Sequence, residues 1–160
     1  MSPIANIKLP TAKQTKRLNR QVAALPFIFV KKDLLICLIT SRETNRWIIP
    51  KGWPKTNVAN HQMAEIEAQQ EAGLHGPISK SYLGTYIYKK KLHTFASVMC
   101  KVEVYPLHVT EQDITWPEKD QREIAWFTQE QAAQQVDEEE LSQLLLMIKK
   151  GKKQTLTLKG

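Results

Sequence analysis

The stretch that decides the fold is RWIIPKGWPKTNVANHQMAEIEAQQEAGL, which runs from Arg46 to Leu74. It places a short apolar strand, a Lys-Gly-Trp-Pro turn and a helix in immediate succession. The helix carries Glu67 and Glu71, which are four residues apart and therefore lie on one helical face. Like charges so placed repel unless a cation lies between them, and Mg²⁺ accepts one or two carboxylates together with substrate phosphates. A solvated helix face is the alternative interpretation of the helix alone.

The glycines and acids of this stretch follow a wider pattern. The pattern is the Nudix box, G-x5-E-x7-R-E-U-x-E-E-x-G-U, in which U is a bulky apolar residue. The residues that match its spacing are Gly52, Glu67, Glu71, Gly73 and Leu74. The chain resembles a Nudix hydrolase over about residues 20–148. The segments RWIIPKGWP and WPEKDQREIAWFT (116–128) resemble the branch that includes diphosphoinositol polyphosphate and dinucleoside polyphosphate hydrolases.

The resemblance implies an α/β fold, an α/β/α sandwich in which a mixed β-sheet lies between helices. It also implies hydrolysis of a diphosphate linkage by attack of water on phosphorus, with Mg²⁺ (or Mn²⁺) bound to the box carboxylates. Carried over to this sequence, the metal ligands are Glu67, Gln70, Glu71 and the backbone carbonyl of Lys51. Gly52 corresponds to the tight turn that lets the backbone approach the metal.

The general base lies outside the box in many family members. Glu118 is our first candidate, and it joins the two box glutamates in the predicted catalytic set. Glu111, Asp120 and Glu123 are further candidates, and loop solvation is the alternative role for each of these acids.

Three positions depart from the box. Val58 stands where the box has its first Glu, Ile66 where it has Arg, and Gln70 where it has the first member of the Glu-Glu pair. Replacing an ion pair as a unit by apolar packing is energetically plausible, whereas loss of one partner alone would leave an unpaired charge. Gln70 removes one negative charge, although its carbonyl oxygen can still act as a neutral ligand. We therefore expect fewer or weaker bound ions than in a full-box member, and loss of activity stays open.

Basic and aromatic residues around the turn are candidates for substrate binding. Arg46, Lys51 and the run from Lys89 to Lys91 can bind anionic phosphates, and Arg can do so in bidentate fashion. Trp53, beside Gly52, can stack on a base or cover the site. The alternatives are a solvated lysine run at a hairpin tip and a tryptophan that only fills space.

The apolar pattern predicts how the chain is organised around the box. Strands are expected at residues 21–30, 34–40 and 47–50, followed by a helix from an Asn57 N-cap to Ala72, with Gly73 as its stop. The buried stripe expected on this helix comprises Met63, Ala64, Ala68 and Ala72.

The second half is expected to contain three more strands and two helices. Strands 78–88 and 93–105 are joined by the turn 89–92, and a strand at 123–127 follows. Thr128 with Gln131 carries a capping-box signal, and Asp137 with Glu140 repeats it before a C-terminal amphipathic helix.

The 160-residue chain has a net charge of +7, but the basic residues concentrate at its ends. Residues 1–32 hold seven Lys or Arg and no acid, whereas residues 33–148 carry a net charge of −5. We expect a basic N-terminal segment (1–19), a Nudix domain (20–148) and a basic C-terminal tail (149–160). Such tails are more often only solvated, and we expect no nucleic-acid partner except through them.

Other classes of protein find little support in the sequence. The apolar run at residues 22–30 is too short to span a bilayer, so we expect no membrane partner. Cys37 and Cys100 lie in apolar runs and indicate reduced core residues of a cytoplasmic protein, although a transit peptide stays open. The four histidines are scattered without a cysteine partner, which argues against a zinc site. The oligomeric state is open.

Three functions remain in competition. The first is a metal-dependent pyrophosphohydrolase acting on a small nucleoside- or inositol-linked polyphosphate. The second is a catalytically weakened Nudix domain that binds a phosphorylated ligand or a protein, and the departures from the box support it. The third is a nucleic-acid adaptor, which only the basic tails support.

Overall fold

The structure, a computed structural model, describes residues 18–148. Its centre is a seven-stranded mixed sheet whose main path has the order β3-β2-β1-β7-β6. Along this path lie β3 (Trp47–Ile48), β2 (Asp33–Thr40), β1 (Asn19–Val30), β7 (Ala96–His108) and β6 (Gly84–His93). Two further strands, β4 (Lys51–Gly52) and β9 (Ile124–Thr128), pair with β1 and β2. Strands β1 and β7 are parallel, and the other pairs of this sheet are antiparallel.

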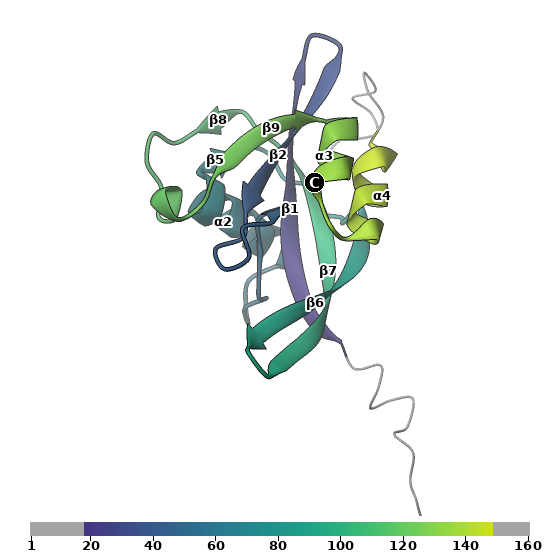
Figure 1. Cartoon of the computed structure of the whole chain (residues 1–160). Coiled ribbons are helices and arrows are strands. Elements are labelled where there is room, and N and C mark those ends of the chain that lie inside the picture. Colours follow the sequence, from purple (N-terminus) through teal and green to yellow (C-terminus); the bar gives the residue numbers. More distant parts are fainter. Residues whose placement is uncertain (1–17, 149–160) are drawn as a thin grey trace, which may run out of the picture.

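Helices cover both faces of the sheet (Figure 1). Helix α2 (Asn60–Ala72) packs on one face, and α3 (Gln129–Gln135) and α4 (Glu139–Met147) pack on the other. A small second sheet joins β5 (Leu74–His75) to β8 (Glu111–Gln112), and a 3₁₀ helix, η2, spans Lys119–Gln121. The expected α/β/α sandwich is confirmed.

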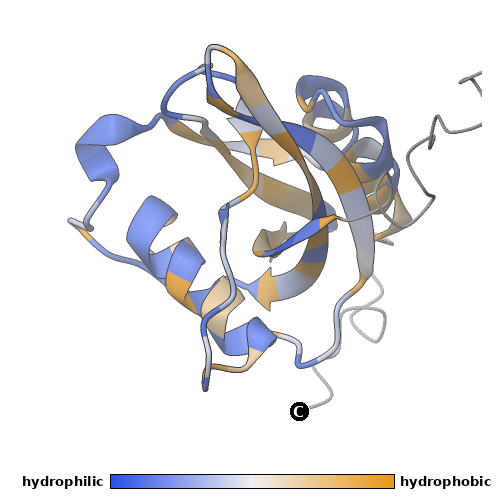
Figure 2. Ribbon diagram, turned by 90° about the horizontal axis from the view of Figure 1, so that it is seen from below, coloured by the Kyte–Doolittle hydropathy of each residue, from blue (hydrophilic) through white to orange (hydrophobic). Residues whose placement is uncertain are grey.

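The central part of β1, residues 21–27, is buried on both faces of the sheet. Its successive side chains alternate between the two faces. Ala23, Leu25 and Phe27 belong to the apolar cluster that includes the buried residues of α3 and α4. Val22 and Ala24 belong to the cluster under α2. Figure 2 shows this distribution of hydropathy: apolar residues concentrate on the central strands, and hydrophilic residues dominate the helices and loops.

Helix α2 begins at Asn60, and its N-cap is Ala59 rather than the predicted Asn57. No side chain caps this helix, and Asn57 instead has a φ of 68°, a left-handed conformation that Asn tolerates. Gly73 ends the helix as predicted, with a φ of 66°. The predicted stripe is buried against the sheet: Met63, Ala64, Ala68 and Ala72.

The β6–β7 hairpin lies further along the chain than predicted. Residues 79–83 are not part of β6, and the Ser79 hydroxyl there bonds to the backbone of Ser81, which competes with strand pairing. The run from Lys89 to Lys91 lies within β6 instead of forming the turn, since charged side chains suit an edge strand. Thr94 and Phe95 form the turn.

The two capping signals before α3 and α4 have different outcomes. The capping box of Thr128 and Gln131 is confirmed at the start of α3. The second signal is wrong, because Glu138 is the N-cap of α4 and no side chain caps that helix. Asp137 instead contacts Arg46 at 3.4 Å, and Glu140 accepts the backbone N–H of Ile87 at 3.0 Å.

The remaining expectations concern the termini and the cysteines. The basic runs within residues 1–17 and 149–160 fall outside the described residues. Cys37 and Cys100 are both free and buried, as predicted. None of the helices found between residues 18 and 148 is long and apolar enough to cross a membrane.

Candidate active site

Helix α2 presents Glu67 and Glu71 toward the short strand β4. The Glu71 side chain is 5% exposed, and the two carboxyl groups share a hydrogen bond. The Glu67 carboxyl group packs against Gly52, where an added Cβ would overlap it. The missing side chain at position 52 therefore leaves the space that Glu67 occupies.

The pKa of Glu71 reflects this crowding. Burial, followed by the hydrogen bond with Glu67, raises the pKa of Glu71 to about 9, and the Arg122 guanidinium opposes the shift. Burial disfavours the charged form, so with protein groups alone around it the Glu71 carboxyl group holds its proton more tightly than an exposed one. A cation bound between the two carboxyl groups would favour the ionised form.

The segment 113–122 is hydrogen-bonded to the C-terminal end of α2. The backbone N–H of Glu118 donates to the carbonyl of Gln70 at 3.1 Å, and that of Asp113 donates to Gly73 at 2.8 Å. The Trp116 ring packs so closely on Gly73 that a Cβ there would overlap it. These contacts bring Glu118 beside the two glutamates of the helix.

Arg122 joins Glu118 to Glu71. Its Nε and Nη2 each lie 2.9 Å from Glu118 Oε1, and Nη2 lies 3.5 Å from Glu71 Oε1. Its Nη1 donates to the Thr40 carbonyl at 2.9 Å. One guanidinium therefore holds the carboxylate of the predicted base beside the carboxyl group of the helix.

These groups line a cleft with a volume of about 540 Å³. Seven basic and four acidic residues form its walls, so the cleft suits an anionic ligand. The predicted site residues that line it are Arg46, Lys51, Gly52, Trp53, Glu67, Glu71, Lys89, Lys91 and Glu118. Gln70 does not, because its side chain is exposed outside the cleft. The other candidates for the base, which are Glu111, Asp120 and Glu123, also lie outside it.

Two cations of the cleft are held by other parts of the fold. Arg46 Nη1 lies 3.2 Å from Glu138 and 3.4 Å from Asp137 at the start of α4. Lys51 Nζ lies 5.0 Å from the centre of the Tyr88 ring. Burial lowers the pKa of Lys51 to about 8, with Glu71 opposing the shift, so Lys51 keeps most of its charge at neutral pH.

Sequence comparison identifies the family of this site. No protein-family model matches the chain. The chain is 32% identical over 130 residues to "Nudix hydrolase 16, mitochondrial" of Arabidopsis thaliana, and the match covers 72% of each chain. The chain belongs to the Nudix hydrolase family. Membership of this family makes it a hydrolase that acts on phosphoric anhydride bonds.

Solved Nudix structures share the fold of this chain. The Ap4A hydrolase of C. elegans superposes with a TM-score of 0.60 at 17% identity, over 81% of this chain and 95% of that one. The Nudix domain of Shewanella oneidensis NrtR, solved with ADP ribose, has a TM-score of 0.60 at 15% identity. That match covers 92% of this chain and 98% of the NrtR domain. At these identities the likeness establishes the fold alone.

The departures from the Nudix box have a structural explanation at two of three positions. Val58 and Ile66 both pack against the apolar cluster under α2, so the lost Glu and Arg are replaced together by apolar contacts. The third, Gln70, is exposed, and the carbonyl of its backbone serves to anchor Glu118.

The donors that this Nudix site offers fit a magnesium-like ion. Among residues 18–148, no three His, Cys, Asp or Glu side chains form a preassembled metal site. Glu67 and Glu71 supply two converging carboxyl groups, and Mg²⁺ commonly takes one or two carboxylates, with water and substrate phosphates completing its shell. The residues present therefore fit an ion that is shared with the substrate.

Sequence reasoning missed several residues of the cleft. Arg42, Arg122, Gln21 and Tyr88 line it together with the predicted residues. Arg122 lies within the segment WPEKDQREIAWFT, which carried part of the Nudix resemblance. Its contacts with Glu71 and Thr40 join distant parts of the chain, and no local sequence pattern predicts such contacts.

Proposed function

We propose that this Nudix hydrolase is a metal-dependent pyrophosphohydrolase that cleaves a diphosphate linkage in a polyphosphorylated nucleoside or inositol compound. The observation that carries the proposal is the convergence of Glu67, Glu71 and Glu118 at one end of a cationic cleft. Two of the solved Nudix structures are an Ap4A hydrolase and a domain with ADP ribose, and both names refer to nucleotide-derived compounds. They support a small phosphorylated molecule as the ligand.

Each group has a role in this proposal. Glu67 and Glu71 hold Mg²⁺ or Mn²⁺, which when bound neutralises charge on the phosphate oxygens. Glu118 accepts a proton from the attacking water, for which its place beside Glu71 is suited. Arg46 and Lys51 bind the phosphate oxygens.

Residues at the rim of the cleft support a polyphosphorylated nucleoside or inositol compound as the substrate. Lys89 and Lys91 supply positive charge on the β6 wall, which suits a ligand with phosphates beyond the scissile linkage. Trp53 is 44% exposed at the rim, where its ring is available to stack on a base.

A substrate screen tests the proposal. Purified protein is incubated with Mg²⁺ or Mn²⁺ and with diadenosine polyphosphates, nucleoside triphosphates, nucleotide sugars and diphosphoinositol phosphates, and products are separated chromatographically. We expect turnover with at least one compound, and Glu71→Gln should reduce it about 100-fold or more because a key charged group is lost. Glu65→Gln, on the same helix but outside the cleft, is the matched control and should keep its activity.

The same screen decides between the enzyme and the binding module. A folded wild-type protein that is inert with every compound and both metals would favour the weakened domain that only binds a phosphorylated ligand or a protein. Calorimetric titration with the same compounds would then identify the ligand, and Glu71→Gln would leave that affinity largely unchanged.

A further inference from the structure

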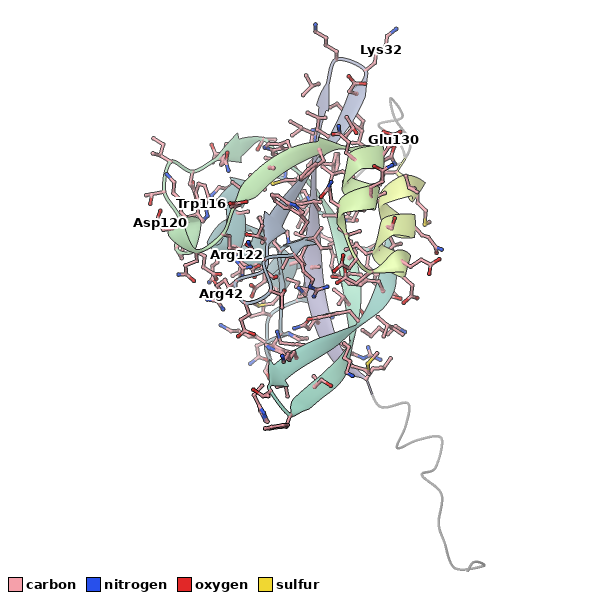
Figure 3. All side chains as sticks on the ribbon, in the orientation of Figure 1. Lys32, Arg42, Trp116, Asp120, Arg122 and Glu130 are labelled. Carbon is pink, nitrogen blue, oxygen red and sulfur yellow. The ribbon has the colours of Figure 1, made fainter. Side chains whose placement is uncertain are left out.

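Arg122 is a buried cation at the centre of the site. Its side chain is 9% exposed, and in Figure 3 it lies, like Arg42 and Trp116, on the side of the sheet away from α3 and α4. All three nitrogens of its guanidinium contact protein atoms. Their partners are the Glu118 carboxylate, the Glu71 carboxyl group and the Thr40 carbonyl.

A comparison with Arg42 indicates what holds Glu118. Arg42 Nε also lies near Glu118 Oε1, but at 3.8 Å and with a side chain that is 56% exposed. An exposed pair of this kind contributes little to the position of its partner. Arg122 makes two contacts of 2.9 Å to the same oxygen from a buried position, and such charge-assisted bonds are shorter and stronger. The backbone bond to Gln70 places the main chain of Glu118, and the position of its carboxylate depends mainly on Arg122.

Arg122 also changes the charge that Glu71 presents. Its Nη2 lies 3.5 Å from Glu71 Oε1, where a fixed positive charge favours the carboxylate but repels any second cation at that group. Because both side chains are buried, solvent and salt screen this interaction only weakly. The guanidinium and a divalent ion thus compete electrostatically for the same carboxyl group.

We propose that Arg122 is a positioning residue that holds Glu118 beside Glu71 for proton transfer and at the same time weakens the binding of the divalent ion at Glu71. The inference rests on the proposed function. A positioning role of Arg122 affects turnover and metal affinity in opposite directions, which a purely structural role would not do. Loss of Arg122 lowers turnover but tightens metal binding, whereas a residue needed only for folding would weaken both.

Metal binding is the first test, and it needs no substrate. EDTA-treated, folded protein is titrated with Mn²⁺ and the free ion is followed by electron paramagnetic resonance. We expect Arg122→Gln to bind Mn²⁺ about fivefold more tightly than wild type, since the competing charge is gone. Arg122→Lys keeps the charge and should stay within about twofold of wild type. Arg20→Gln, an exposed position on β1 outside the cleft, is the control and should not change the affinity.

Turnover of the substrate found by the screen is the second test. Arg122→Gln should lower kcat about 30-fold and change KM less than about threefold, because a misplaced base slows the chemical step. Arg122→Lys should recover part of kcat, since an ammonium lacks the planar fork that fixes a carboxylate. At saturating metal, Arg122→Gln should have no further effect on kcat in a Glu118→Gln background, because the remaining effect of Arg122 then acts through Glu118.

The possible outcomes distinguish this inference from the proposed function. Unchanged or weaker Mn²⁺ binding by folded Arg122→Gln overturns the inference, whether or not a substrate is known. Wild-type kcat in Arg122→Gln also overturns it. If that variant does not fold, Arg122→Lys decides, and a kcat equal to wild type would contradict the positioning role. A wild-type protein that binds no Mn²⁺ defeats the proposed metal site itself, and the inference with it.

Discussion

The two faces of the central sheet differ in the interactions that their helices make. On the face covered by α3 and α4, apolar packing dominates: Leu141 and Leu145 are fully buried, and Thr128 caps α3. The buried amide of Gln129 donates to the Leu145 carbonyl at 2.7 Å and so joins the two helices.

The face covered by α2 carries unfavourable features. Its helix places two glutamates together, and burial raises the pKa of Glu71; like α4, this helix begins without a side-chain cap. A chain optimised for stability alone would avoid these costs, since a buried carboxyl group without a full set of partners disfavours folding. The α3–α4 face therefore stabilises the fold, whereas the α2 face also holds charges in place for a ligand.

The largest effect should come from opening the core of the α3–α4 face. Leu145→Ala removes a fully buried side chain from the apolar cluster and should lower the free energy of unfolding by about 2–5 kcal/mol. Chemical denaturation measures the change, and activity per folded molecule should be kept. Leu146→Ala, on the same helix but 53% exposed, is the control and should change stability by less than about 0.5 kcal/mol. Equal losses in both variants would contradict the assignment of this face.

Alanine substitutions at two glycines, one on each face, should separate the effect on turnover from the effect on stability. At Gly52, a Cβ would overlap the Glu67 carboxyl group, which can swing away. Gly52→Ala should therefore reduce turnover about 100-fold by misplacing that group, with little change in melting temperature.

The second glycine lies under α4. At Gly84, a Cβ would overlap the buried Leu144 side chain. Gly84→Ala should lower stability by about 1–3 kcal/mol through overpacking and leave turnover per folded molecule intact. If both alanine variants lost activity and stability in parallel, the division between the two faces would not hold.

Removal of the metal tests the α2 face through its proposed ligand. Free Mg²⁺ or Mn²⁺ at ten times its dissociation constant should stabilise the protein by about 1.4 kcal/mol, because it binds only the folded chain. Thermal unfolding with metal and with EDTA measures the shift. Glu71→Gln should abolish it, and Thr128→Ala, on the opposite face, should keep it. An identical melting temperature with metal and with EDTA in the wild type would contradict the metal site.

The smallest effect should come from the helix cap of the α3–α4 face. Thr128 Oγ1 accepts the Gln131 N–H at 3.2 Å, and Gln131 Oε1 accepts the Thr128 N–H at 3.1 Å. Thr128→Ala should cost about 1 kcal/mol, with unchanged activity, as judged by denaturant unfolding. Gln135→Ala, an exposed position in the last turn of the same helix, is the control and should change stability by less than about 0.5 kcal/mol. A similar cost at both positions would show that the cap is not the source.

Local patterns predicted the elements that depend on neighbouring residues. The apolar runs located β1, β2 and β9, and the stop at Gly73 and the capping box at Thr128 were recognised from residues a few positions apart. The same reasoning failed where distant contacts compete. Asp137 contacts Arg46 instead of capping α4, and the lysine run extends the edge strand β6 instead of turning.

The sequence by itself determined that Glu67 and Glu71 share a helical face beside a glycine turn, because helical periodicity and chain spacing are properties of neighbouring residues. It also determined the family, through the spacing of the box. Only the tertiary structure decided that Glu118 and Arg122 come to the same carboxyl group and that Gln70 stays outside the cleft. Those placements arise from packing between segments that are far apart in the chain, where shape and charge complementarity act and no sequence period exists.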